Sequence, residues 1–475
     1  MCSVSYEAFE ALKNGEYRRA AELLERAAAE AGYASDMINH AYTLALYRIG
    51  EKSQLADFAF RVGSSLVGSD PGSAMDYFQR AVLAGLDSDR LRRIAEVHEQ
   101  WSAERPSKTL TQPVTRVGHV VRSVAHADVG TQYLRLLISA LQRRGIESTV
   151  FTTESNSSWF LNPDPVPQSA VTPADVVRAS LKLASVEGDF VERANRVAND
   201  VRDFGLPLVF FHENLSDQIA ARVAGLAAAP VQVSIVREPS VDANLFDGWA
   251  YLAQNGLARS RFAERLAQWI PPASDIESRL KTVAFENKHS LGIESASSVS
   301  ATFSGPPRDQ AAGFIKALIE ILKRFPKHFH LFAGPVEVRA IRGMLHSEGV
   351  LPRVRFLGQV TDTTPLLGAI DVYLAPFPDS GRASILEMMA AGKPVVAMRH
   401  AANSEFNTAA ELVEERELTP PTSGEYIHAA DRLLRDAAIR HRLGDTLIRR
   451  FRQEFTTERL GDRFMEFIQL VCDET

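Results

Sequence analysis

The feature that most constrains this chain is an alternation of short apolar segments with amphipathic segments, which runs twice along its length. The first run opens with RVGHVVRSV at 116–124 and includes LPLVFFHE at 206–213, and the second opens with SSVSATFSG at 297–305. Strands that are apolar on both faces and are separated by helices predict a parallel sheet covered on both sides. We therefore predict two Rossmann-like α/β domains in tandem, at 114–285 and at 295–475, the second closed by C-terminal helices.

Residues 1–105 differ from the rest because they show helical periodicity and no convincing strand. The segment ALKNGEYRRAAELLERA, which begins at Ala11, returns in looser form from Ala45, 34 residues later, and a weaker third copy ends at 74–86. That period is the one expected of tetratricopeptide helix pairs. We predict an all-α, tetratricopeptide-like helical domain, with a plain helical bundle as the alternative. The proline-containing stretch SAERPSKTLTQP at 102–113 predicts a linker.

The most informative segment is APFPDSGRASILEMMAAGKPVVAM at 375–398. A buried strand there ends near Pro376, and a loop leads to the start of a helix. Gly381 lets the backbone approach a ligand closely, and the free amides of the first helical turn favour a bound diphosphate. Glu387 lies about one turn further on, where a carboxylate can accept hydrogen bonds from ribose hydroxyls. The residues of this segment predicted to bind a nucleotide are Asp379, Ser380, Gly381, Arg382, Ala383, Ser384 and Glu387.

This segment resembles the donor-binding signature of GT-B glycosyltransferases. Asp379 and Glu387 bracket seven residues and are followed by MAAGKPVV, and many retaining members carry Glu at both ends of that spacing. The resemblance implies a GT-B fold that binds a nucleotide sugar. It also implies a cation for the diphosphate, which Arg308 would supply through its guanidinium, and contacts to the base through the backbone of Gln359 and Val360.

A second segment, AAPVQVSIVREPSVDANLFDGWAYLA at 228–253, is similar to a segment of O-GlcNAc transferase and SPINDLY-like enzymes. The residues that match in order are Ala229, Pro230, Gln232, Pro239 and Asp247. Those enzymes also carry N-terminal tetratricopeptide repeats, so the resemblance implies transfer to a protein acceptor. The chain departs from that family in two respects. The family usually has Asp where Glu387 stands, and its first βα loop has a His-Pro pair that is absent here.

Two pairs of polar residues after strands of the first Rossmann-like domain are candidates for catalysis. His126 and Asp128 follow the first strand, and His212 and Glu213 follow LPLVFF. Ligands of open α/β sheets bind beyond the carboxyl ends of the strands, and His is suited to act as a general base near neutral pH. We predict His126 as the base of an inverting reaction, with His212 as the rival. A helix cap or loop role for His126 is the alternative.

Other polar residues have weaker functional readings. Arg237 and Glu238 end the next strand and are predicted to orient the acceptor or to pair with each other. His328 and His330 share one strand face, but a metal site needs a third ligand that the nearby sequence does not supply. We therefore predict no metal and no other cofactor.

The composition is that of an ordinary globular protein. Hydrophobic residues make up 45% of the 475 residues and charged residues 24%, and 53 Lys and Arg against 59 Asp and Glu give a net charge of −6. This balance argues against a disordered chain and against a basic nucleic-acid coat. The two cysteines lie at opposite ends, and no apolar run reaches the ~18 residues needed to span a bilayer. We expect a cytoplasmic protein with no nucleic-acid partner and no integral membrane segment.

Together these features predict a Leloir glycosyltransferase. It would transfer a hexose or N-acetylhexosamine from a nucleotide-diphosphate sugar, a UDP sugar by first choice, to a protein docked partly on the N-terminal repeats. One alternative acceptor is a glycan or lipid-linked saccharide. Another class of function is a non-catalytic repeat scaffold with a nucleotide-sensing GT-B module. The sequence leaves open the base, the sugar, the anomeric outcome and the oligomeric state, for which a homo-oligomer is one option.

Overall fold

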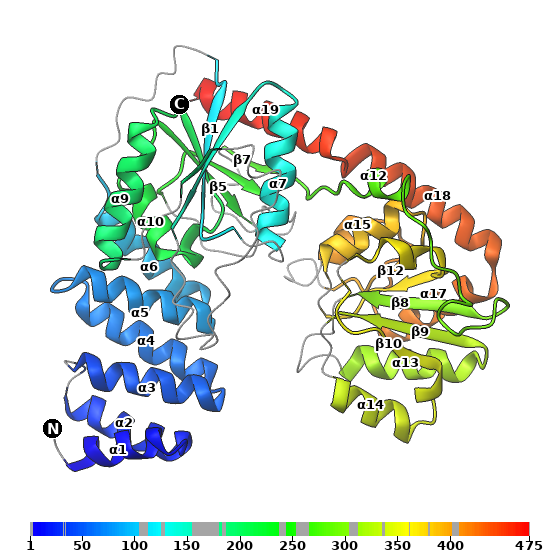
Figure 1. The fold of residues 1–475 in the computed structure, drawn as a ribbon, viewed down its shortest axis with the longest axis horizontal. Coiled ribbons are helices and arrows are strands. Elements are labelled where there is room, and N and C mark those ends of the chain that lie inside the picture. Colours follow the sequence, from blue (N-terminus) through cyan, green and yellow to red (C-terminus); the bar gives the residue numbers. More distant parts are fainter. Residues whose placement is uncertain are drawn as a thin grey trace. The chain divides into compact units, whose positions relative to one another are not determined.

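The computed structural model divides the chain into two compact units (Figure 1). The first comprises Met1–Tyr251, Ser260–Gln268 and Met465–Thr475, and the second comprises Leu252–Arg259 and Trp269–Phe464. The residues predicted to form the helical domain and most of the first Rossmann-like domain thus belong to one unit. The structure describes residues 3–31, 33, 35–103, 113–124, 129–153, 180–182, 187–236, 244–252, 266–303, 312–334, 338–360, 362–378, 381–400 and 408–474.

The N-terminal part of the first unit is a stack of helix pairs. Its described residues form α1 (Ser3–Lys13), α2 (Tyr17–Glu30), α3 (Asp36–Ile49), α4 (Lys52–Leu66), α5 (Pro71–Ala84) and α6 (Ser88–Gln100). Helix α2 packs on α1 and α3, and α4 packs on α5. Buried alanines on α2, among them Ala20 and Ala28, allow this close approach. Three successive helix pairs are what three copies of a 34-residue repeat would produce.

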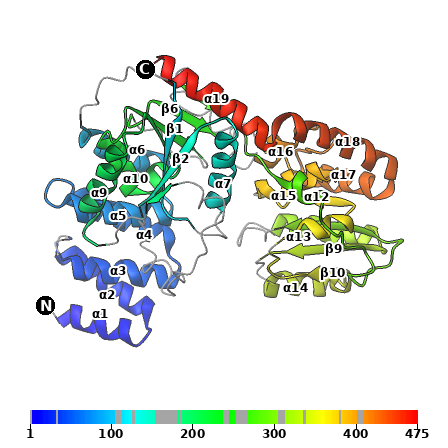
Figure 2. The same ribbon diagram turned by 45° about the horizontal axis from the view of Figure 1, so that its top comes forward.

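The rest of the first unit is built on a seven-stranded sheet of order β3-β2-β1-β4-β5-β6-β7. The strands are β1 (Arg116–Val121), β2 (Glu147–Thr152), β3 (Ser180–Lys182), β4 (Leu208–Phe211), β5 (Val231–Val236), β6 (Gly248–Tyr251) and β7 (Ala267–Trp269). Neighbouring strands from β3 to β6 are parallel. In both views α7 (Val129–Gln142) covers one face, and α9 (Phe190–Asp203) and α10 (Gln218–Gly225) cover the other (Figures 1 and 2). The strand order reverses between β1 and β4, where such sheets bind ligands.

The second unit contains a five-stranded parallel sheet of order β10-β9-β8-β11-β12. Its strands are β8 (Ser298–Phe303), β9 (His328–Ala333), β10 (Val354–Phe356), β11 (Val372–Leu374) and β12 (Val395–Val396). Its helices are α12 (Ile276–Leu280), α13 (Ala312–Arg324), α14 (Val338–Ser347), α15 (Arg382–Ala390), α16 (Thr408–Val413), α17 (Ser423–Arg435) and α18 (Ala437–Glu454), with 3-10 turns η2 (Leu351–Arg353) and η3 (Thr364–Gly368). Helix α19 (Thr457–Glu474) begins in this unit. Here the order reverses between β8 and β11. The predicted fold class, helices followed by two parallel α/β sheets, is confirmed.

A buried polar seam, formed by Gln79, His98 and Gln218, joins the N-terminal helices to the first sheet's own helices. The side-chain amide of Gln79 on α5 donates to the carbonyl of Ser216 at 2.8 Å, and its oxygen accepts a hydrogen bond from the backbone N–H of Gln218 at 2.9 Å. His98 Nε2 on α6 lies 2.8 Å from Gln218 Oε1. All three seam side chains are completely buried. The seam therefore fixes η1 (Asn214–Ser216) and α10, which directly follow β4.

Candidate functional site

The candidate nucleotide site begins at the carboxyl end of β11, beside the point where the second sheet reverses its strand order. Residues 375–381 connect this strand to α15, whose N-cap is Gly381. Glycine has no side chain with which to cap a helix. The backbone amides of the first turn, at Arg382, Ala383 and Ser384, lie at the positive end of the helix dipole, which favours a bound anion there.

Buried hydroxyl groups hold the start of α15 against the sheet. Tyr373 on β11 is completely buried, and its hydroxyl donates to the Phe303 carbonyl at 3.2 Å. Burial raises the pKa of Tyr373 to about 12, while a side-chain hydrogen bond with Ser384 opposes this shift. The hydroxyl of Tyr426 on α17 donates to the carbonyl of Ala375 at 2.9 Å. The Ser384 side chain is thus part of the scaffold, and its backbone amide is the group that suits a ligand.

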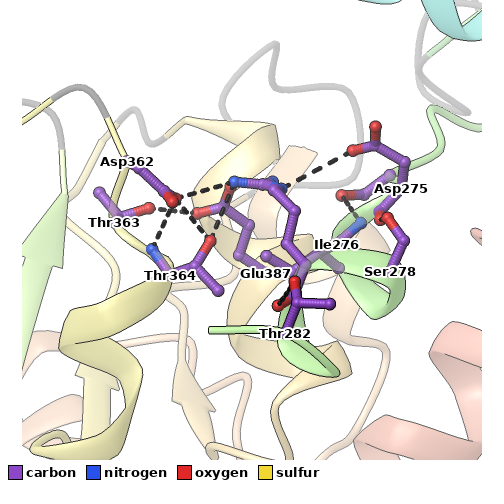
Figure 3. A network of polar contacts seen from close by, with 10 residues as sticks. Asp275, Ile276, Ser278, Thr282, Asp362, Thr363, Thr364 and Glu387 are labelled. Atoms are coloured by element: carbon purple, nitrogen blue, oxygen red, sulfur yellow. Dashed lines mark hydrogen bonds and ion pairs between the residues drawn. The ribbon is translucent and has the colours of Figure 1, made fainter. Parts of the chain in front are cut away.

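Glu387 has partners at both of its carboxylate oxygens (Figure 3). Arg279 Nη2, from α12, donates to Oε1 at 3.0 Å, and Thr363 Oγ1 donates to Oε2 at 2.7 Å. The Glu387 side chain is 14% exposed. The sequence predicts that Glu387 accepts hydrogen bonds from a ribose, but it gives no sign of these two protein partners. Neither Arg279 nor Thr363 belongs to a recognisable motif.

The residues predicted to contact the nucleotide base, Gln359 and Val360, follow β10. Gln359 is exposed and Val360 is half-buried. Backbone hydrogen bonds tie this segment to the end of β9, from the Leu357 amide to the Phe332 carbonyl at 2.8 Å and from the Gly334 amide to the Gly358 carbonyl at 2.7 Å. Because the strands are parallel, their carboxyl ends share one edge of the sheet. The predicted base contacts and the start of α15 therefore follow strands that end at the same edge.

In the first unit, His212 directly follows β4, but it is buried rather than exposed as an accessible general base would be. It is 2% exposed, and its Nε2 lies 3.1 Å from Nδ1 of His119 on β1. His119 Nε2 in turn lies 3.2 Å from Ser148 Oγ, and burial lowers the pKa of His119 to about 3. The structure therefore counts against His212 as the rival general base. A residue buried in this way cannot reach an acceptor hydroxyl without local rearrangement.

Glu213, the next residue, is half-buried and lies 3.7 Å from Arg122 Nη2 through its Oε2. Its carbonyl accepts a hydrogen bond from the Ser216 hydroxyl. These contacts stabilise the turn after β4. Some of the predicted site residues lie outside the described residues: His126, Asp128, Arg237, Glu238, Arg308, Asp379 and Ser380.

The two histidines on β9 belong to the buried interior of the second sheet. His328 and His330 are completely buried, and the Ser300 hydroxyl lies within hydrogen-bond distance of both rings, at 2.9 Å and 2.8 Å. Burial lowers the pKa of His328 to about 4. Across the part of the chain that the structure describes, no three His, Cys, Asp or Glu side chains gather in a way that would hold a metal ion.

The sequence and the fold are similar to those of known glycosyltransferases. Residues 299–436 match the glycosyl transferases group 1 family. The structure is similar to that of a mutant O-GlcNAc transferase from Thermobaculum terrenum, with a TM-score of 0.57, 17% identity, and coverage of 99% of this chain and 98% of that chain. The fold is GT-B. No curated protein matches the sequence.

Two further solved structures support this assignment over the two sheets. A glycosyltransferase from Rickettsia africae gives a TM-score of 0.58 at 11% identity, covering 77% of this chain and 100% of that chain. Anabaena HepE in complex with UDP gives 0.57 at 17% identity, covering 74% and 99%. The predicted resemblance to GT-B enzymes is thus confirmed as a likeness of fold. Among the described residues, no helix is long and apolar enough to cross a membrane.

Proposed function

We propose that this protein is a Leloir glycosyltransferase that moves a hexose or N-acetylhexosamine from a UDP sugar to an acceptor. The observation that carries the proposal is the glycine-capped start of α15, followed on the same helix by Glu387, within the segment that matches the glycosyl transferases group 1 family. Support for uridine comes from HepE, whose structures include complexes with UDP and with UDP-glucose.

The chemistry assigned to this site is stabilisation of the leaving group. As the bond to the sugar breaks, negative charge grows on the diphosphate, and the first-turn amides of α15 with the Arg382 guanidinium would stabilise it. Glu387 would accept hydrogen bonds from the ribose and so fix the donor. An inverting reaction would use His126 as its base, and a retaining reaction would need no such residue. The proposal includes no metal and no other cofactor.

For the acceptor, we propose a cytoplasmic protein that docks partly on the N-terminal helices. The likeness to O-GlcNAc transferase extends over 99% of this chain and therefore includes these helices. The buried seam links the same helices to the turn that follows β4. A saccharide acceptor is the second candidate, favoured by the likeness to the lipopolysaccharide galactosyltransferase WaaB, with a TM-score of 0.55 over 74% of this chain.

A binding panel tests the donor. Calorimetric titration with UDP, GDP, ADP and dTDP should show tightest binding for UDP, and incubation with UDP sugars should release UDP slowly in the absence of acceptor. A protein that binds none of these nucleotides and hydrolyses no nucleotide sugar would instead be the non-catalytic scaffold.

Two substitutions at one position separate the amide from the guanidinium. Arg382→Ala removes only the guanidinium. Arg382→Pro also removes the backbone N–H, at the first helical position, where proline is well tolerated. A hydrogen bond from this amide to a charged phosphate is worth about 1.5–3 kcal/mol, so the proline variant should bind UDP roughly ten- to a hundredfold more weakly than the alanine variant. Equal affinities of the two variants would show that this amide does not contact the diphosphate.

A further inference from the structure

Arg279 pairs with three carboxylates of the second unit, those of Asp275, Asp362 and Glu387. Besides Glu387, its guanidinium contacts Asp362 Oδ1 at 3.1 Å through Nη1, and its Nε lies 3.9 Å from Asp275 Oδ1. Nη1 also donates to the hydroxyl of Thr364 at 3.0 Å. One side chain thus connects three elements that are far apart in the sequence: α12, the turn that begins η3, and α15.

This cluster fixes the orientation of the Glu387 carboxylate. Arg279 and Thr363 each donate to a different oxygen of it. Thr363 is itself placed by its neighbours, because Asp362 accepts hydrogen bonds from the backbone amide and the hydroxyl of Thr364, at 3.0 Å and 2.6 Å. A carboxylate has about four lone-pair sites, so each oxygen keeps one that can accept a further hydrogen bond. The remaining acceptor positions are therefore aimed in set directions.

Arg279 also neutralises the negative charge of Glu387. Burial lowers the pKa of Arg279, but Glu387, Asp275 and Asp362 outweigh burial, and the pKa is raised overall. Glu387 lies five residues beyond the first residue of α15, about 7–8 Å along the helix axis. This is within the screening distance of physiological salt, so an unpaired carboxylate there would repel an anionic diphosphate. Arg279 offsets that repulsion.

We propose that Arg279 is a positioning residue for the nucleotide ribose: it holds and neutralises Glu387 so that the free acceptor positions of this carboxylate receive the ribose hydroxyls. The inference rests on the proposed function, because it concerns the same nucleotide site. Its distinguishing consequence is that loss of Arg279 weakens recognition of the ribose hydroxyls and not only overall affinity.

The test compares UDP with 2′,3′-dideoxyuridine diphosphate, which lacks both hydroxyls, by calorimetric titration of the full chain. Wild type should prefer UDP by roughly ten- to a hundredfold, the value of hydrogen bonds to a charged group. In Arg279→Met this preference should fall to about threefold or less. Arg279→Lys should lie between them, because an ammonium cannot reproduce the several fixed contacts of a guanidinium.

A matched control pairs with the same short helix. Arg452 Nε, on α18, lies 2.8 Å from Oε1 of Glu277 on α12, and the side chains are 64% and 36% exposed. Arg452→Met therefore also removes a cation paired with α12, but it should leave the preference for UDP unchanged. Thr363→Val keeps the shape of the side chain, removes the second donor to Glu387, and should lower the preference partially.

The outcomes separate this inference from the proposed function. Wild type that prefers UDP, together with an Arg279→Met variant that binds both nucleotides more weakly by the same factor, would overturn the inference and leave the nucleotide site intact. Wild type that binds UDP without preference for the hydroxyls would overturn the role of Glu387 and the inference with it. Failure of wild type to bind any nucleoside diphosphate would refute the proposed function itself.

Discussion

Helix α15 is held in place by a contact between two backbones, and this contact gives a sharp prediction. Gly392 lies just past the end of α15 with a φ of +67°, a conformation that favours glycine, and Gly444 lies in the middle of α18. A Cβ added at Gly444 would lie 2.1 Å from the carbonyl oxygen of Gly392, whereas real Cβ atoms almost never approach within 3.0 Å. Gly444→Ala therefore forces α18 and the end of α15 apart by about 0.9 Å, the difference between these distances.

The size of the effect follows from packing. The obstacle is backbone and not the flexible end of a side chain, so the strain cannot be relieved by a rotamer change, and overpacking of this kind costs about 1–3 kcal/mol or more. Gly343, on the exposed side of α14, offers a matched control because a Cβ there meets nothing within 4 Å. Gly343→Ala should stabilise the second unit by about 0.5–1 kcal/mol, since alanine loses less conformational entropy in a helix than glycine.

Calorimetric unfolding and hydrogen exchange measure both variants. Gly444→Ala should lower the melting temperature of the second unit by roughly 2–12 °C, at about 2–4 °C per kcal/mol for a unit of this size, and it should speed exchange in α15 and α18. It should also weaken UDP binding, because α15 carries the candidate site. If Gly444→Ala proves as stable as Gly343→Ala, with unchanged exchange in α15, the close backbone contact does not exist in solution.

Two further predictions concern buried polar groups. Burial lowers the pKa of His98 and His328 to about 4 and that of His119 to about 3, whereas the unfolded chain binds protons near pH 6.5. As pH falls, the unfolded state therefore binds protons before the folded state does. The free energy of unfolding should drop between about pH 6.5 and 4, by up to about 1.4 kcal/mol per pH unit for each of these histidines. Equal melting temperatures at about pH 7 and pH 5 would contradict this. In the seam, Gln79→Ala leaves the buried backbone amide of Gln218 without its acceptor and removes one of the two donors to the Ser216 carbonyl, the other being Arg122. It should destabilise the first unit by about 1–3 kcal/mol, while Gln100→Ala, at an exposed position of α6, should change stability by less than about 0.5 kcal/mol in the same denaturation assay.

The fold could be predicted from sequence because its signals are local. The longer strands are short apolar runs, such as LVFF of β4 and VQVSIV of β5, and they alternate with helical periods, which indicates parallel sheets. Short strands such as SLK of β3 and AQW of β7 carry no such signal. The start of α15 was also predictable, since Gly381 and the apolar helix that follows it stand next to each other. Such signals need no knowledge of which distant residues meet in space.

The contacts of the site could not be predicted because they join distant segments. His212 follows an apolar strand, as a catalytic residue at a sheet edge would, but its burial depends on its contact with His119, 93 residues earlier in the chain. The seam joins Gln79 to Gln218 across 139 residues, so a stretch that reads as a linker separates two parts that pack closely. Periodicity reports which face of an element is buried, but it does not report which polar side chain meets another.

The pairing of Glu387 with Arg279 shows why this limit matters for function. A carboxylate that serves a ribose must stand near a diphosphate of the same sign, and that arrangement is unfavourable unless a cation accompanies it. The donor signature supplies the carboxylate and the helix start from one segment, but the compensating guanidinium comes from a residue 108 positions earlier. The motif alone therefore does not reveal the positive charge of Arg279 that balances Glu387. In other sites of this kind, an acidic residue beside a phosphate-binding helix should likewise have a cation in contact with it, and the three-dimensional structure is needed to find that cation.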